Sequence, residues 1–139
     1  MISFNFETNF QLKNQKELSS WITETITSEA CKEGEINYVF CDDEYLHKLN
    51  VEFLQHDTLT DIISFDYSVG KELHGDVFIS IERVKENSEE LGVDFNTELH
   101  RVMIHGILHY CGYKDKEEAD KTEMRQKEDV YLSRLTEFL

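Results

Sequence analysis

Two histidines four residues apart form the part of the sequence best suited to chemistry. His105 and His109 are followed by Gly112 and Asp115. Because an α-helix has about 3.6 residues per turn, both imidazoles would lie on one face of a helix. Gly112 is a natural helix stop, since glycine enters the left-handed conformation at little cost. Two imidazoles and one carboxylate suit a zinc ion with one open position. We therefore predict a catalytic metal site at His105, His109 and Asp115.

The helix that carries the histidines is predicted to be buried on most sides. Apolar residues occupy most of its circumference, whereas Glu98, Arg101, His105 and His109 fall within a stripe about 80° wide. We call these four residues the polar seam. A polar seam on a buried helix costs free energy unless it has partners. A metal ion would provide them; core histidines bonded to carboxylates, or a solvated strip, are the alternatives. Gly112 and Asp115 favour the metal.

The residue after the first histidine bears on the type of reaction. The spacing from His105 to Asp115 also matches the metzincin zinc proteases, whose third ligand follows a glycine turn. Such proteases need a glutamate directly after the first histidine as general base, and this sequence has Gly106 there. A glycine within a helix costs up to about 1 kcal/mol relative to alanine. We expect it to allow close approach of a substrate or of another backbone, and we consider peptide hydrolysis disfavoured.

Composition describes one globular domain spanning residues 1–139. Hydrophobic residues make up 40% and aromatic residues 12% of the 139, and no apolar run approaches membrane-spanning length. The N-terminus has neither a basic start nor an apolar signal segment. Three cysteines, Cys31, Cys41 and Cys111, are an odd number without a CxxC pair, and we expect them to be small core residues. These features predict a cytoplasmic protein without a membrane partner.

The net charge of −15 argues against a general nucleic-acid binder. Neutralisation of phosphates supplies most non-specific affinity, and this surface as a whole should repel RNA and DNA. A nucleic-acid substrate would have to be met locally, by a metal ion and a few cations, or on a partner that supplies affinity. The alternative is that the acidity serves only solubility.

The pattern of apolar residues predicts an α+β fold: a single domain with a four-stranded mixed sheet, helices packed on it, and a central buried helix carrying the metal-binding histidines. Strands 59–67 and 75–81 should be antiparallel neighbours, because a hairpin connection separates them. The predicted strands are 2–6, 35–41, 59–67 and 75–81. The predicted helices are 15–32 (ended by Gly34), a short one capped by Asp42 or Asp43, 82–91, 97–111 and 117–138.

Three ordered blocks of sequence resemble the YbeY family of metal-dependent endoribonucleases. The run from His105 to Tyr113 is similar to the family signature His-Gly-x-Leu-His-Leu-x-Gly-Tyr-Asp-His. The second block is Leu49-Asn50 followed by Asp57-Thr58-Leu59-Thr60-Asp61-Ile62-Ile63-Ser64-Phe65. The third is Gly75-Asp76-Val77-Phe78-Ile79-Ser80.

The resemblance implies a zinc-dependent endoribonuclease specific for single-stranded RNA. It implies a role in ribosomal RNA processing, above all at the 3′ end of the small-subunit RNA, and in ribosome quality control. With the acidic surface, it leads us to expect one zinc ion per chain, weak binding to free RNA, and a ribosome or ribosome-associated protein as partner. Asp61 and Glu98 are candidate general bases, although Asp61 could equally cap or brace a strand and Glu98 hydrogen-bond a ligand histidine. The strand at 75–80 could border the cleft and contact an extended substrate, or be only a sheet strand.

Two departures from the family pattern leave alternatives open. Asp115 stands where the family has its third metal-binding histidine, and Phe53-Leu54 stand where it carries an arginine. Carboxylate oxygen is an acceptable zinc ligand. An arginine would clamp an anionic transition state, so other cations must compensate. The candidates are His56, Arg101, Lys114 and Lys116, the two lysines being equally well explained as solvated charges. A metzincin-like hydrolase or protease, and a non-catalytic ribosome-assembly factor with a structural metal, are the alternative functions.

Overall fold

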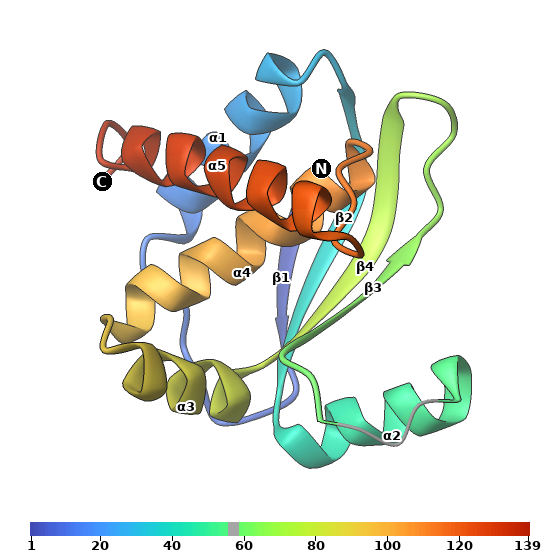
Figure 1. Ribbon diagram of the computed structural model, residues 1–139, viewed down its shortest axis with the longest axis vertical. Helices are drawn as coiled ribbons and strands as arrows, with labels where there is room; N and C mark the ends of the chain where they lie inside the picture. The colour runs from blue at the N-terminus through green and yellow to red at the C-terminus, as the bar shows by residue number, and fades with distance from the viewer. Residues whose placement is uncertain (56–58) are drawn as a thin grey trace.

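The computed structural model describes residues 1–55 and 59–139. Asp57 and Thr58 of the second family-like block and His56, a candidate cation, lie outside the described residues. The described residues form four strands and five helices (Figure 1). In chain order they are β1 (Ile2–Phe6), α1 (Gln15–Ser28), β2 (Lys32–Cys41), α2 (Asp43–Leu54), β3 (Ile62–Asp66), β4 (Glu72–Ser80), α3 (Ile81–Leu91), α4 (Phe95–Tyr110) and α5 (Glu118–Leu135).

The strands form one mixed sheet in the order β1-β2-β4-β3. β2 pairs in parallel with both β1 and β4, whereas β3 and β4 are antiparallel. The hairpin between them is closed by the Tyr67 N–H, which donates to the His74 carbonyl at 2.8 Å. The predicted α+β class, four-stranded mixed sheet and antiparallel neighbours are confirmed. β3 is therefore an edge strand, and β4 is paired on both sides.

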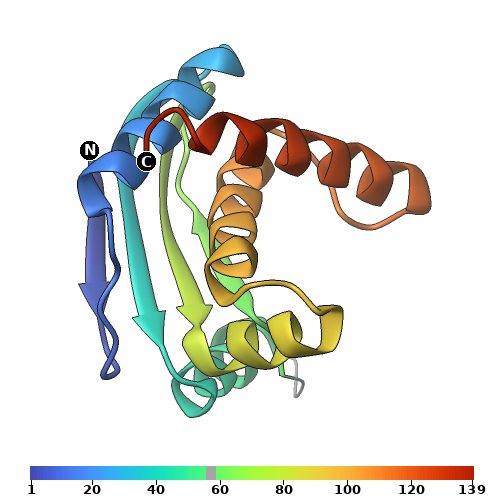
Figure 2. The same ribbon diagram turned by 90° about the vertical axis from the view of Figure 1, so that its left-hand side faces the viewer.

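The main hydrophobic core lies between one face of the sheet and the helices (Figures 1 and 2). Figure 2 shows α3, α4 and α5 on the same side of the sheet, with α4 close to the strands. Alternate strand residues such as Tyr38, Phe40, Val77 and Ile79 enter this core. The intervening residues face the other way, where α2 covers a small second cluster of Cys41, Leu46 and Ile63.

The end of α1 differs from the prediction. The helix ends at Ser28, not near residue 32, because Ala30 takes a left-handed conformation with φ of 59°. The Cys31 N–H then donates to the Ile26 carbonyl and the Ala30 N–H to the Thr27 carbonyl, which closes the helix. Gly34, predicted to stop the helix, lies within β2, where a Cβ would overlap the His74 ring and the Leu73 carbonyl. A non-glycine residue at the left-handed position explains the error.

Other boundaries also differ from the prediction. β3 begins at Ile62 instead of residue 59, and Leu59 is exposed. β4 begins at Glu72 and ends at Ser80. The Ser80 hydroxyl accepts a hydrogen bond from the Arg83 N–H at 3.2 Å and caps α3, which therefore begins at Ile81, one residue before the predicted start. α5 ends at Leu135, three residues before the predicted end.

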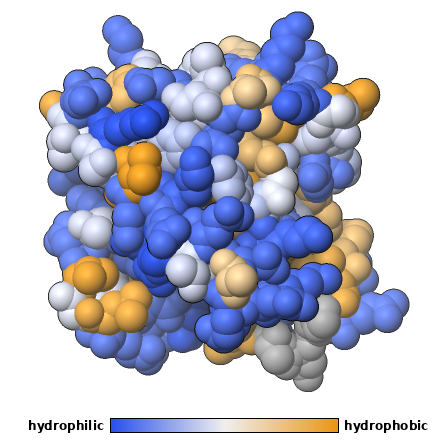
Figure 3. Space-filling model, turned by 45° about the horizontal axis from the view of Figure 1, so that its top comes forward, coloured by the Kyte–Doolittle hydropathy of each residue, from blue (hydrophilic) through white to orange (hydrophobic). Residues whose placement is uncertain are grey.

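Other predictions about the chain concern membrane-spanning segments, the cysteines and the polarity of the surface. Across the described ranges, no helix is long and apolar enough to span a membrane. All three cysteines are free, but only Cys41 is fully buried; Cys31 and Cys111 are half-buried. Figure 3 shows a mostly hydrophilic face with small, separate hydrophobic patches, in keeping with the acidic composition.

Candidate metal centre

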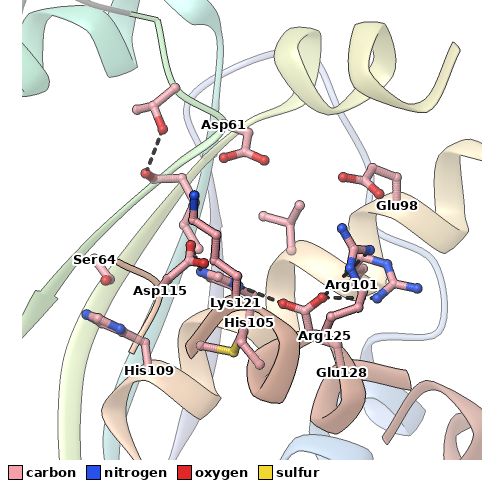
Figure 4. Close-up of a pocket in the computed structure, with 14 residues that line it drawn as sticks. Asp61, Ser64, Glu98, Arg101, His105, His109, Asp115, Lys121, Arg125 and Glu128 are labelled. Atoms are coloured by element: carbon pink, nitrogen blue, oxygen red, sulfur yellow. Dashed lines mark hydrogen bonds and ion pairs between the residues drawn. The ribbon is translucent and has the colours of Figure 1, made fainter. Parts of the chain in front are cut away.

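A cavity of about 520 Å³ lies between α4, α5 and the edge strand β3 (Figure 4). All six residues that the sequence analysis predicted as site residues line this cavity. Asp61 is far from the helix in sequence, so its presence here is a result of the fold. The lining residues are Thr60, Asp61, Ile62, Ser64, Glu98, Arg101, Val102, His105, His109, Asp115, Lys121, Met124, Arg125 and Glu128.

The position of α4 aims the polar seam at this cavity. The apolar residues of α4 are buried, as predicted, and the Tyr38 hydroxyl from β2 donates to the Met103 carbonyl at 2.8 Å. Gly106 lets the helix approach the sheet, because a Cβ there would meet Ile62 Cδ1 and Val77 Cγ1 at 3.3 Å. The expectation that Gly106 makes room for a substrate or another backbone is therefore wrong. Its neighbours are side chains of the sheet.

His105 is held by a residue that the sequence analysis missed. Its Nδ1 lies 2.7 Å from Oε2 of Glu128, which comes from α5 and is only 4% exposed. Nδ1 therefore carries the proton toward Glu128, and Nε2 lies toward Asp115, 3.7 Å from Oδ2. Burial lowers the pKa of His105, but the hydrogen bond and charge of Glu128, with Asp115 and Asp61, outweigh burial and raise it. A carboxylate behind a histidine is the usual support of a metal-ligating imidazole.

Glu128 also engages the arginine of the polar seam. Arg101 Nη1 donates to Glu128 Oε1 at 3.0 Å, and Nη2 to Asp129 Oδ1 at 2.9 Å. Both terminal nitrogens of Arg101 thus bind carboxylates of α5, so its charge serves to neutralise the buried Glu128. The signal for Glu128 was available in the helical spacing of the buried residues of α5, which are Met124, Glu128, Tyr131 and Leu135.

His109 and Asp115 depend on the turn after α4. Gly112 has φ of 109°, and the Tyr113 N–H donates to the Leu108 carbonyl at 3.1 Å, which reverses the chain as predicted. The Tyr113 carbonyl returns to His109 Nδ1 at 3.2 Å. Both histidines of the seam therefore have Nδ1 engaged, which leaves Nε2 available in each. His109 is exposed at the cavity wall, on the side of Ser64 (Figure 4).

The turn is fixed to the rest of the protein by Glu29 at the end of α1. The Tyr113 hydroxyl donates to Glu29 Oε1 at 2.6 Å, and the Tyr131 hydroxyl donates to Oε2, to which Lys127 Nζ also lies at 3.5 Å. Burial raises the pKa of Glu29, but these hydrogen bonds and the Lys127 charge outweigh burial and lower it. The segment that carries Asp115 is thus anchored to both α1 and α5.

The donor types of His105, His109 and Asp115 are ones that zinc accepts, and two of the three side chains lie close together. Ligands 2.0–2.2 Å from a tetrahedral zinc lie roughly 3.3 Å apart, close to the 3.7 Å between His105 Nε2 and Asp115 Oδ2. Among the residues described, no three His, Cys, Asp or Glu side chains are gathered closely enough to hold a metal. His109 lies one helical turn from His105, and an exposed side chain of this kind changes rotamer within nanoseconds.

Two carboxyl groups, Asp61 before β3 and Glu98 at the start of the seam, lie at the end of the cavity away from His109 (Figure 4). Burial raises the pKa of Asp61, against hydrogen bonds from the N–H groups of Asp61 and Ile62 and the charge of His105. Burial and the Asp61 charge raise the pKa of Glu98, which is only 6% exposed. Carboxyl groups with raised pKa values are suited to proton transfer. Asp61 also braces the sheet, since its carbonyl accepts from the Ser80 N–H at 3.0 Å.

Other predicted contributors fall outside the cavity. β4 does not border it: none of its residues is in the cavity lining, and its backbone pairs with β2 and β3. The edge strand β3 takes that place, because sequence alone did not order the strands. Lys114 and Lys116 do not line the cavity, and His56 lies outside the described residues. Sequence reasoning missed two cations of α5, Lys121 and Arg125, which do line it.

Comparisons with known proteins agree with this architecture. The family model for Endoribonuclease YbeY matches residues 2–136. The chain is 62% identical to Endoribonuclease YbeY of Flavobacterium johnsoniae, covering 96% of each chain, and 59% identical to that of Flavobacterium psychrophilum, covering 95% of this chain and 94% of the relative. A solution structure of a protein from Thermotoga maritima superposes with a TM-score of 0.69 at 26% identity, covering 97% of this chain and 89% of the other. The chain therefore belongs to the Endoribonuclease YbeY family.

Proposed function

We propose that this protein is a zinc-dependent endoribonuclease that cleaves single-stranded RNA, with His105, His109 and Asp115 as the metal ligands. Its substrate is ribosomal RNA in the cytoplasm, at the 3′ end of the small-subunit RNA and in ribosome quality control. The observation that carries the proposal is the pairing of His105 Nε2 with Asp115 Oδ2 at 3.7 Å, with Glu128 behind the same imidazole. Membership in a family of endoribonucleases supports RNA as the substrate.

The residues around the seam have distinct roles in this mechanism. A bound zinc ion supplies Lewis-acid polarisation of a phosphoryl oxygen and activation of water. Glu128 keeps the His105 proton on Nδ1, and Arg101 neutralises Glu128. Asp61 and Glu98 line the same cavity and have raised pKa values, which supports a role in accepting a proton from the nucleophile or holding one for the leaving oxygen. The pH dependence of kcat/KM in variants of Asp61 and of Glu98 would distinguish the two roles.

Two alternative functions predict different assay results. A metzincin-like protease needs a base after the first histidine, and Gly106 in that position packs against Ile62 and Val77. Asp61 or Glu98 would have to act instead, which leaves peptide hydrolysis less favoured. A non-catalytic ribosome-assembly factor would bind metal without cleaving RNA. An accessible cavity beside the ligands favours an open coordination position over a structural metal.

The proposal is tested by metal analysis together with an RNA-cleavage assay. We expect the wild type to bind one zinc ion and cleave single-stranded RNA, and His109→Ala and Asp115→Ala to bind zinc more weakly and to lose cleavage. Zinc bound without cleavage would favour the assembly factor. A protein that neither copurifies with a divalent metal nor can be loaded with one would refute the site. Because the net charge is −15, we expect weak binding to free RNA at physiological salt, and tight binding would contradict dependence on a ribosomal partner.

A further inference from the structure

Two cations of α5 lie on the same side of the cavity. Lys121 and Arg125 are four residues apart, so their side chains leave one face of the helix about a turn apart. Both line the cavity that also contains His105 and His109. Figure 4 shows Lys121 reaching from α5 past Asp115 toward the β3 side, with Arg125 lying near Arg101 and Glu128. The pair thus spans the α5 wall of the cavity.

Among the described residues that line the cavity, these two carry the cationic side chains available to a ligand. The third cation of the cavity, Arg101, has both terminal nitrogens on carboxylates at 3.0 and 2.9 Å. Arg125 is 57% exposed, and its Nη1 approaches Glu128 Oε1 only at 4.0 Å. The Lys121 side chain is exposed and makes no hydrogen bond or ion pair with any residue that the structure describes. Their charges are therefore not consumed inside the protein.

The charge of the cavity indicates what they bind. Four carboxylates, Asp61, Glu98, Asp115 and Glu128, line a cavity in a protein of net charge −15. Without Lys121 and Arg125 it would repel a phosphodiester even with a divalent ion present. Proteins that bind single strands use cationic grooves that follow the backbone. Arginine adds a fork that matches two phosphate oxygens.

We propose that Lys121 and Arg125 form a phosphate-binding pair that holds the backbone of a single-stranded RNA along α5. The RNA would run between α5 and the edge strand β3, so that the scissile phosphate of the RNA faces the polar seam. This inference rests on the proposed function and adds the substrate-binding residues to it. The pair positions substrate; it takes no part in proton transfer.

Salt-dependent binding tests the pair directly. The proteins are the zinc-loaded wild type, Lys121→Gln, Arg125→Gln, the double variant and Lys16→Gln, an equal charge change at an exposed position of α1. Their binding to fluorescein-labelled single-stranded oligodeoxythymidine and to RNA is followed by fluorescence anisotropy between low and moderate salt. The slope of log K against log salt is negative, and its magnitude should decrease by about 0.7 for each lost phosphate contact. We expect a decrease of about 0.7 in each single variant, about 1.4 in the double variant and none in Lys16→Gln.

Cleavage kinetics separate substrate positioning from chemistry. In the double variant, KM for RNA should rise about tenfold while kcat changes less than about twofold. The Lys121→Arg variant, which keeps the charge, should have the salt-dependence slope of the wild type. Slopes in the Gln variants equal to that of Lys16→Gln would overturn the inference. Because both side chains are exposed, the variants should fold, which a thermal melt confirms. If the wild type does not cleave RNA, the proposed function fails, whereas the binding slopes still decide whether the pair holds a phosphate backbone.

Discussion

The two histidines of the polar seam define an inner end (His105) and an outer end (His109 and the turn that carries Asp115) of the candidate metal centre, and these two ends are built differently. At the inner end, His105 is mostly buried, bonded to Glu128 and close to Asp115. At the outer end, His109 is exposed, and within the described part of the chain its imidazole hydrogen-bonds only to the Tyr113 carbonyl of the following turn. The inner end is fixed by contacts between α4 and α5, which are far apart in sequence. The outer end depends on a local turn.

This difference indicates how the site would form around a metal. Glu128 orients His105 before any ion arrives, so less conformational freedom is lost there on binding. In the proposed site His109 would have to change rotamer to join His105 and Asp115, whereas the turn that carries Asp115 is anchored by Glu29. We therefore expect substitutions at the inner end to be severe and those at the outer end to be tolerated when a donor atom is kept.

The largest effect should come from His105→Ala. The change removes the most preorganised donor and leaves Glu128 paired only with arginine. We expect zinc binding to be lost and kcat/KM for RNA to fall by about 10³-fold or more, since a catalytic metal contributes several kcal/mol. The control is His100→Ala on the same helix, whose ring lies against Trp21 outside the cavity. Equal losses in the two variants would mean that the effect is one of folding.

Substitutions of Asp115 test whether the outer end tolerates a different donor. Asp115→Ala should weaken zinc binding by about 100-fold. Asp115→His should stay within about tenfold of the wild type, because imidazole nitrogen is also a zinc ligand. Competition with a fluorescent zinc chelator measures both. An Asp115→His variant as weak as Asp115→Ala would show that the carboxylate itself is required and that the outer end is as strict as the inner one.

Sequence reasoning found the seam because helical periodicity is a local property. The spacing of His105, His109, Gly112 and Asp115 predicted one face of a helix and the turn after it, and the structure confirms both the helix and the turn. Glu128 was missed because its role depends on how α5 packs against α4, twenty-three residues away from His105 in the chain. The place of β4 inside the sheet was missed for the same reason, since strand order is set by long-range pairing.

Substitutions of Glu128 test the preorganisation of the inner end. Glu128→Ala should weaken zinc binding by about 30-fold, within the range of 10–100-fold seen when such supporting carboxylates are removed. Loss of a buried acceptor should also lower the free energy of unfolding by about 1–3 kcal/mol. Glu128→Gln keeps an acceptor oxygen and should lose less of both. Glu123→Gln, at an exposed position of α5, is the control. Wild-type zinc affinity in Glu128→Ala would contradict the claim that Glu128 preorganises the inner end.

The smallest effect should come from the anchor of the outer turn. Because the pKa of Glu29 is lowered in the folded protein, its stabilisation is present above the ordinary pKa of 4.5 and is lost as pH falls through the lowered value. Glu29→Gln should therefore reduce the free energy of unfolding by about 1.5 kcal/mol at pH 7. The difference should shrink below pH 4.5. Urea denaturation of the metal-free protein measures it, with Glu24→Gln as the exposed control on α1.

A constant Glu29→Gln difference across this pH range would show that the stabilisation does not come from the ionised carboxylate. Zinc affinity provides a second readout, because the Tyr113 hydroxyl donates to Glu29 and Asp115 follows two residues after Tyr113. We expect a decrease of only a few-fold in Glu29→Gln, since the ligands themselves are unchanged. A decrease as large as that in Glu128→Ala would place the rigid part of the site at the outer end.

The central claim is tested most directly by anomalous diffraction at the zinc edge from crystals of the zinc-loaded protein. The account predicts one zinc peak bound by Nε2 of His105, Nε2 of His109 and a carboxylate oxygen of Asp115, with Glu128 still on Nδ1 of His105. A zinc peak bound by other side chains, or zinc bound without His109, would contradict it.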